Sequence, residues 1–315
     1  MNSDELKNLI GRVSYLHFIQ GLTQSVIAQK LDLSRGVVQR LLKTAVEKGL
    51  VEIKINDPQL RCYEAEFELA ERFGLDGAVV ADNKGIESVK SSLARSAALW
   101  LGRHLSHEQT IAVGMGTTLR AITSFMRKKA LKGVRIIPLM GTFSKKGGDS
   151  PFELASNLAD ILGAECYAIP APAVADSTET KKMLLSESGI KEVLSLARKA
   201  DLALVGLGAA SDGGSLLTAG YISRAEAASM ASKGAVGELL GHFYDHKGKP
   251  VKSRSSPRII GFDLDEIRGL KNVAAVAGGP EKYQAVEGAL AGGLIKTLIT
   301  DLKTARRLLD GLKAA

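Results

Sequence analysis

Two glycines and two threonines in "VGMGTTLRAI" (113–122) have the spacing of an anion-binding loop. An apolar run ends at Gly114, and Gly116, Thr117 and Thr118 follow at the expected start of a helix. Glycine lets the backbone approach a ligand closely, and the N–H groups at a helix start favour an anion. The stretch differs from the dinucleotide pattern GxGxxG and has no P-loop lysine, so we expect it to bind a phosphate monoester.

Three further loops of glycine and small polar residues follow apolar runs: "MGTFSKKGG" (140–148), "GLGAASDGG" (206–214) and "AGGPEKY" (277–283). They contribute Gly141, Gly208 and Lys282 to the candidate site, with the lysine as a cation. Each loop taken alone could be ordinary turn chemistry. Because ligands of parallel sheets bind beyond the carboxyl ends of the strands, we expect the four loops to share one pocket.

The elements that would position these loops are apolar runs alternating with amphipathic helices. This alternation predicts an α/β fold, a Rossmann-like and mostly parallel sheet covered on both faces. The strands are expected at residues 77–81, 110–115, 134–140, 165–169, 202–208, 272–278 and 297–300. The helices between them are expected at residues 88–105, 119–129, 151–162 and 190–200.

The N-terminal segment has a different pattern, typical of a winged helix-turn-helix. A first helix is expected over residues 3–20, a second from the N-cap Thr23 to Leu31, and a third from the N-cap Ser34 to Lys48. The alternating "LVEIKI" (50–55) then predicts a strand or wing. With Pro58 near the boundary, we expect a DNA-binding domain over residues 1–57 and a larger effector and oligomerisation domain over 58–315.

The third helix places cations and an amide on the side opposite its apolar residues. Such a face suits a recognition helix, because cations bind phosphates while arginine and glutamine hydrogen-bond base edges. The alternative is the solvated face of an ordinary three-helix bundle. The predicted DNA-binding residues are Thr23, Gln24, Ser34, Arg35, Gly36, Gln39, Arg40 and Lys43.

The composition fits a protein that binds polyanions. The chain has 315 residues and a formal net charge of +8, which permits nucleic-acid partners. Its two cysteines lie far apart, and no histidine pattern suggests a metal site. No membrane span and no secretion signal are expected, which favours a cytoplasmic protein. We predict no cofactor, no metal and no catalytic residues.

Several segments, in order along the chain, resemble the SorC family of bacterial transcriptional regulators. They are "GLTQSVIAQKLDLSRGVVQRLLKTAVEKGLVEI", "AVGMGTTL", "ADLALVGLGA", "KGAVGELLGHFYDHKGKPV" and "VAAVAGGPEKYQAVEGALAGGLIKTLITD". The resemblance implies a winged helix-turn-helix joined to an effector domain similar to sugar-phosphate isomerases and glucosamine-6-phosphate deaminase. It implies a double-stranded DNA operator, a phosphorylated sugar or polyol as effector, and a homodimer or homotetramer.

The resemblance also assigns individual effector residues. The family's phosphate loop falls on Gly114, Gly116, Thr117 and Thr118, its acidic residue on Glu238, a second acid on Asp245, and its lysine on Lys282. Met115 and the segment "GTFSKKGG" (141–148) depart from the family pattern near the expected sugar. Asp245 could instead be a turn residue in "DHKG".

Two other functions remain open at this point. An isomerase or deaminase fused to a DNA-binding segment would need a general base, for which Asp245 and Glu238 are the candidates. The N-terminal segment could also be a protein-interaction module that does not bind DNA.

Overall fold

The computed structural model describes residues 3–82, 88–143, 150–210, 217, 220 and 222–311. The chain folds into two compact units. We call Met1–Leu60 the head and Arg61–Ala315 the body. In the described residues, no helix is both long and apolar enough to cross a membrane.

The head contains three helices around a small apolar core. α1 (Ser3–Ser14) continues into the π-helical turn η1 (Tyr15–Ile19), followed by α2 (Gln24–Leu31) and α3 (Arg35–Glu47). The Thr23 hydroxyl accepts the Val26 N–H at 3.4 Å, and the Ser34 hydroxyl accepts the Val37 N–H at 3.3 Å. Both expected N-caps are therefore confirmed. The core residues are Ile10, Val13, Ile27, Ala28, Val38, Leu41, Leu42 and Ala45.

The strand expected at residues 50–55 is wrong. The Leu50 and Val51 N–H groups both donate to the Ala45 carbonyl, and the following residues have no strand pairing to any described residue. Alternating side chains favour an extended backbone, but a strand also needs a neighbouring segment to share its hydrogen bonds. The described part of the head offers no such segment.

The body is built on a seven-stranded parallel sheet, as the sequence predicts. Its strand order is β1-β11-β10-β5-β2-β3-β4, and every neighbouring pair is parallel. The strands are β1 (Gly77–Ala81), β2 (Thr110–Val113), β3 (Arg135–Pro138), β4 (Glu165–Cys166), β5 (Leu202–Gly206), β10 (Val273–Val276) and β11 (Thr297–Asp301). β1 has its expected range and β11 is one residue longer, while the other five strands are shorter than expected because their carboxyl ends turn into the loops.

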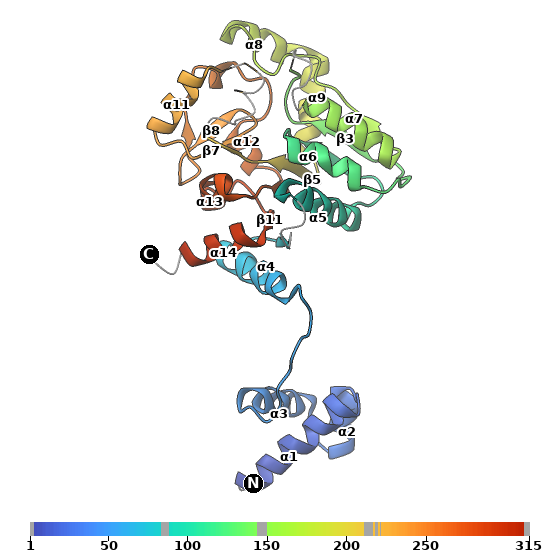
Figure 1. The fold of residues 1–315 in the computed structure, drawn as a ribbon. Helices are drawn as coiled ribbons and strands as arrows, with labels where there is room; N and C mark the ends of the chain where they lie inside the picture. Colours follow the sequence, from blue (N-terminus) through green and yellow to red (C-terminus); the bar gives the residue numbers. More distant parts are fainter. Residues whose placement is uncertain are drawn as a thin grey trace. The chain divides into compact units, whose positions relative to one another are not determined.

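Helices cover both faces of this sheet (Figure 1). One face packs against α5 (Val89–His104), α6 (Thr117–Ile122) and α7 (Pro151–Leu162). The other packs against α4 (Leu60–Phe73), α9 (Ser188–Arg198), α13 (Tyr283–Ala291) and α14 (Leu302–Gly311). Successive strand residues such as Ile111 and Ala112 enter opposite clusters, as the two-residue repeat of a strand requires.

The remaining elements are short. They are the helices α8 (Thr178–Ser186), α11 (Arg224–Ser232) and α12 (Leu264–Arg268) and the 3₁₀ turns η2 (Thr123–Phe125), η3 (Ser256–Arg258) and η4 (Pro280–Lys282). The helix expected at residues 119–129 is wrong in extent, since α6 ends at Ile122. The Thr123 hydroxyl donates to the Arg120 carbonyl at 2.8 Å, and Met126 is extended. A side chain that bonds the preceding turn competes with helix continuation.

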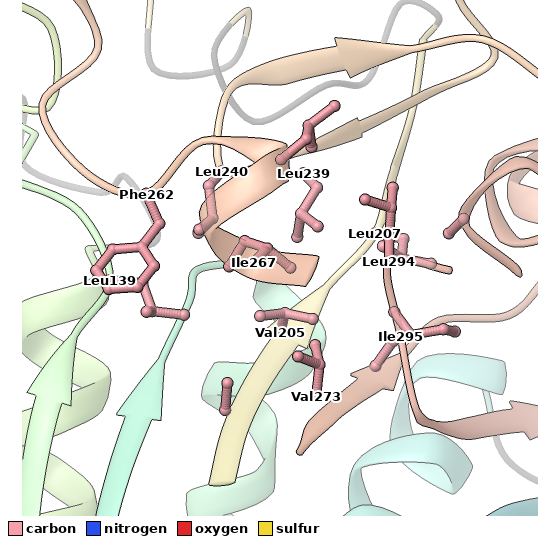
Figure 2. Close-up of a cluster of buried hydrophobic side chains, with 14 of the residues drawn as sticks. Leu139, Val205, Leu207, Leu239, Leu240, Phe262, Ile267, Val273, Leu294 and Ile295 are labelled. Carbon is pink, nitrogen blue, oxygen red and sulfur yellow. The ribbon is translucent and has the colours of Figure 1, made fainter. Parts of the chain in front are cut away.

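A second, antiparallel sheet has the order β6-β7-β8-β9 and was not expected from the sequence. Its strands are β6 (Gly208–Ala209), β7 (Gly237–Leu239), β8 (His242–Tyr244) and β9 (Pro250–Val251). Leucines of the β7–β8 hairpin pack with α12 and the carboxyl side of the large sheet (Figure 2). Leu239 and Leu240 are 1% and 3% exposed, so the hairpin is anchored firmly beside the loops of interest.

Candidate functional site

The loop after β2 begins a helix, as the sequence predicts. Gly116 has φ +137°, a value suited to glycine, and is the N-cap of α6. The first N–H groups of a helix have no acceptor within the helix, so those from Thr117 onward are placed to meet an anion. The Thr117 side chain is exposed and Thr118 is 8% exposed.

Gly114 contributes space rather than a donor. Its N–H already donates to the Leu204 carbonyl at 2.8 Å. A Cβ at Gly114 would lie 3.2 Å from Leu240 Cδ2, so a side chain there would press on the β7–β8 hairpin. Met115 is 5% exposed and packs in the core, away from solvent.

The β7–β8 hairpin, whose Leu240 lies against Gly114, also carries a buried carboxylate. Glu238 is 2% exposed, and its Oε1 accepts the Gly241 N–H at 2.8 Å. Leu240 and Gly241 form the two-residue turn, both with positive φ. Glu238 pairs with Gly208 across the small sheet, and a Cβ at Gly208 would lie 3.1 Å from Glu238 Oε2. The same hairpin therefore contacts the loops that follow β2 and β5: its Leu240 lies against Gly114, and its Glu238 lies beside Gly208.

Lys282 stands at the end of η4, which contacts β6. A buried pair on β11 and α14 fixes the start of its loop. The Gly279 N–H donates to Asp301 Oδ2 at 2.7 Å and to Thr304 Oγ1 at 3.0 Å. Sequence reasoning missed Asp301, although an aspartate ending the apolar run "TLITD" was a usable signal. The large sheet thereby positions Lys282 near Gly208.

Asp245 has the role of a turn residue. It follows β8, and its Oδ1 accepts the N–H groups of Lys247 at 2.8 Å and Lys249 at 2.9 Å. Desolvation raises the pKa of this carboxyl, but the N–H groups of Lys249 and Lys247 and the charges of His246 and Lys249 together lower it to below its usual value. These contacts favour the turn interpretation over a ligand or a general base.

Gly141 also has a structural explanation. Its N–H donates to the Ile260 carbonyl at 2.9 Å, so it is not available to a phosphate. A Cβ there would lie 2.5 Å from the carbonyl oxygens of Ala171 and Pro172. The residue is glycine because two backbone segments cross there. The parts of its loop and of the Gly208 loop at residues 144–149 and 211–216 lie outside the described residues.

Two titratable side chains of β8 have shifted pKa values: Tyr244, which is fully buried near Glu238, and His242, which is half-buried and pairs with Leu239. The Tyr244 hydroxyl donates to the Ala285 carbonyl at 2.9 Å, and burial and the charge of Glu238 raise the pKa of its phenol. Burial lowers the pKa of His242 to about 4, although Asp263 opposes this shift. Its Nε2 is buried without a hydrogen-bond partner among the described residues. The imidazole is therefore neutral at pH 7.

In the head, the polar side of α3 is exposed as the sequence predicts. Arg35, Gly36, Gln39, Arg40 and Lys43 are exposed, and a Cβ at Gly36 would meet nothing within 4 Å. A duplex could therefore approach the helix backbone closely at that point. Lys43 forms an exposed salt bridge with Glu47 at 3.7 Å. Such a surface pair contributes little free energy, so Lys43 can leave Glu47 to bind a DNA phosphate.

The other three predicted DNA-binding residues are Thr23, Gln24 and Ser34, and two of them also have structural roles. The Thr23 and Ser34 hydroxyls are engaged as N-caps of α2 and α3. Gln24, the first residue of α2, is half-buried. Among the predicted DNA-binding residues, the exposed amide and the cations therefore all lie on α3.

The comparisons with known proteins match both units. Residues 57–310 match a family described as "Putative sugar-binding domain", and residues 13–61 match the MarR family. The erythritol catabolism regulatory protein EryD of Brucella abortus is 30% identical over 310 residues, covering 98% of each chain. The transcriptional regulator LsrR of Klebsiella pneumoniae is 34% identical over 310 residues, covering 96% of this chain and 93% of its own.

A solved structure gives the same result for the fold. The full-length sorbitol operon regulator SorC from Klebsiella pneumoniae superposes with a TM-score of 0.75 at 28% identity. The match covers 98% of this chain and 100% of that one. With a DNA-binding head, a sugar-binding body and relatives that match over nearly their full length, this chain belongs to the SorC family of transcriptional regulators.

Proposed function

We propose that this protein controls a carbohydrate-utilisation operon in the cytoplasm, and that a phosphorylated sugar or polyol sets its affinity for the operator. The observation that carries this proposal is the buried Glu238 carboxylate beside Gly208, on the hairpin whose Leu240 lies against Gly114. A carboxylate accepts hydrogen bonds from sugar hydroxyls, while a helix start and a lysine favour phosphate. We assign Gly116, Thr117, Thr118, Glu238 and Lys282 to the effector, with Gly114 and Gly208 providing space.

The relatives support a sugar-type effector. The related EryD is named for erythritol catabolism, the related SorC for a sorbitol operon, and a Bacillus subtilis relative of 30% identity is a deoxyribonucleoside regulator. Erythritol and sorbitol are polyols, and deoxyribonucleosides carry a sugar. We propose an effector of the same chemical class for this chain.

We further propose that the body binds its ligand without converting it. An isomerase needs a base whose pKa is tuned toward neutrality. The pKa of Asp245 is held low by its turn, and one oxygen of Glu238 is engaged by the Gly241 N–H. Neither carboxylate is arranged as a free base.

A screen of sugar phosphates tests the effector assignment. A ligand that binds only the folded state stabilises it by RT ln(1 + [L]/Kd), about 2.7 kcal/mol at a hundredfold excess over Kd. We expect a rise in melting temperature with a phosphorylated sugar or polyol and little with its unphosphorylated form, and no turnover. Stabilisation by nucleotides alone would contradict the proposal, and steady conversion of the ligand would favour the enzyme alternative.

A conservative change at Glu238 tests its role. Glu238→Gln keeps the volume and an oxygen for the Gly241 N–H, but removes the charge. Hydrogen bonds to charged groups contribute about 1.5–3 kcal/mol against about 0.5–1.5 for neutral ones, so effector affinity should fall about tenfold. Calorimetry would measure the change, with the exposed Glu153→Gln as the matched control. Equal affinity of parent and variant would remove Glu238 from the site.

The head is tested by Arg40→Ala. Arg40 is exposed on α3, so its loss should weaken DNA binding and leave effector binding unchanged. If Arg40 contacts a base, about 1–3 kcal/mol of sequence discrimination is lost; if it contacts phosphate, binding weakens evenly and the salt dependence falls. A gel shift against the upstream region measures both, and unchanged affinity would exclude this face. Arg61→Ala, an exposed arginine of the body, is the control.

We also propose that the protein acts as a homodimer or homotetramer. Two heads on one duplex would read an inverted repeat with half-sites about 34 Å apart or a multiple of that distance. Sedimentation that shows only monomer, with and without DNA, would contradict this assembly.

A further inference from the structure

A segment of the head between α3 and α4, Val51–Ile55, has the alternating sequence of a strand but is paired with no described strand. Ile53 and Ile55 are 57% and 60% exposed. Among the described residues, the backbone N–H and C=O groups of residues 52–55 have no hydrogen-bond partner. An extended backbone with exposed apolar side chains is a template for pairing with another chain.

The side chains of this segment divide into two faces. When the segment forms a strand, Val51, Ile53 and Ile55 fall on one face, because side chains alternate along a strand. Val51 already packs partly against the head core. Glu52 and Lys54 lie on the other face, where their side chains form an exposed ion pair at 3.4 Å. One face is thus wholly apolar and the other carries one charge of each sign.

These faces are self-complementary in an antiparallel register centred on Ile53. In that register Ile53 lies opposite Ile53 of a second copy, and Val51 lies opposite Ile55 on the same apolar face. Glu52 of each copy then lies opposite Lys54 of the other copy, which gives two pairs of opposite charge. Opposite charges and apolar side chains directly across an antiparallel pair are stabilising, whereas like charges are not.

We propose that Val51–Ile55 pairs with the same segment of a second copy across a two-fold axis, forming an intermolecular antiparallel ribbon between two heads. The inference rests on the proposed function only in expecting paired heads. The inference adds which segment joins the two heads, in which register its two copies pair, and which charged residues lie opposite each other. The strand that the sequence predicts at residues 50–55 would form on assembly, when the missing neighbouring segment is supplied.

Disulfide trapping tests the register. The variant Ile53→Cys, in a Cys166→Ser background that removes the exposed native thiol, places two cysteines opposite each other at the axis. Cα atoms of directly opposed residues are about 4.5–5.5 Å apart, which lies within disulfide range. We expect a cross-linked dimer on mild oxidation without DNA. Glu52→Cys in the same background is the matched control, because its copies are offset by two residues and should cross-link poorly.

Charge reversal tests the pairs between copies. Lys54→Glu alone places glutamates opposite glutamates, and Glu52→Lys alone places lysines opposite lysines. Each variant, carrying Ile53→Cys, should dimerise about tenfold more weakly, equivalent to about 1.4 kcal/mol. When the two variants are mixed, every glutamate lies opposite a lysine of the other chain, and the cross-link should return. An ion pair within one chain could not be restored by mixing.

The outcomes separate this inference from the proposed function. A dimer by sedimentation that does not cross-link through Ile53→Cys would overturn the ribbon while leaving paired heads in place. A monomer under all conditions would overturn both. If cross-linking fails while Lys54→Glu weakens DNA binding, the segment contacts DNA as a wing and the ribbon is wrong.

Discussion

Replacing Thr117 and Thr118 together by valine should weaken binding of the phosphorylated effector at least about tenfold. The double variant keeps the side-chain volume and removes two hydroxyls at the start of α6. A hydrogen bond to a charged group contributes about 1.5–3 kcal/mol, so loss of a single one is enough for this effect. Calorimetry with the best ligand of the sugar-phosphate screen would measure it.

Two controls make this result specific. Thr123→Val removes a hydroxyl one turn further along, where it donates to the Arg120 carbonyl, and should leave affinity unchanged. The unphosphorylated sugar should bind the parent and the double variant equally weakly, because it lacks the group that the loop holds. DNA binding without effector should stay the same in both proteins, since the effector acts through its preference between two states. If the double variant binds the phosphorylated ligand as tightly as the parent, the loop is a turn and the phosphate lies elsewhere.

The stability of the body should fall as the pH decreases from 6.5 to about 4, in part because of His242. The pKa of this histidine is about 4 in the folded protein and 6.5 when unperturbed. Above pH 6.5 both states are neutral at this residue. Between the two values the unfolded chain binds the proton and the folded chain does not, so the free energy of unfolding decreases as the pH falls. A shift of this size corresponds to about 3 kcal/mol.

His242→Gln isolates this contribution, because glutamine does not titrate. The difference in unfolding free energy between parent and variant should change across pH 6.5 to about 4 and stay level above pH 7. The fluorescence of Trp100, the single tryptophan of the chain, reports on the body during urea unfolding. Carboxyl groups titrate in the same range but are shared by both proteins, so they cancel. Parallel pH profiles would show that His242 is readily protonated in the folded state.

The large sheet was predictable because its strands are buried on both faces and therefore appear as apolar runs. The same reasoning could not find β6–β9, since strands of two or three residues leave no periodic pattern. The end of α6 was also missed, because it depends on the Thr123 hydroxyl turning back to the Arg120 carbonyl. At residues 50–55 the alternating pattern predicts a strand, but the hydrogen-bonding neighbour that a strand needs is not encoded locally.

For the candidate site, the residue types located the loops. They did not show which glycines precede N–H groups that can bind a ligand and which are glycine only because space is short. Gly116 and Gly141 look alike in the sequence, yet only Gly116 precedes helix N–H groups, while the Gly141 N–H donates to Ile260. Glu238 and Asp245 are likewise both acidic residues of one segment. The Glu238 side chain is buried beside Gly208, whereas that of Asp245 closes its own turn. These differences arise from contacts between distant parts of the chain.

The position of β11 in the sheet determines when the body can be completed during synthesis. Among the described strands β1 pairs only with β11. α4 and α14 lie side by side (Figure 1), and the Arg72 guanidinium of α4 donates to the Leu309 carbonyl of α14. The first strand made therefore waits for the last, for tens of seconds at about 5–20 residues per second. The head, whose contacts are local, can fold on the ribosome long before. A nascent chain can therefore carry a folded head while the sheet of the body still lacks the strand that pairs with β1.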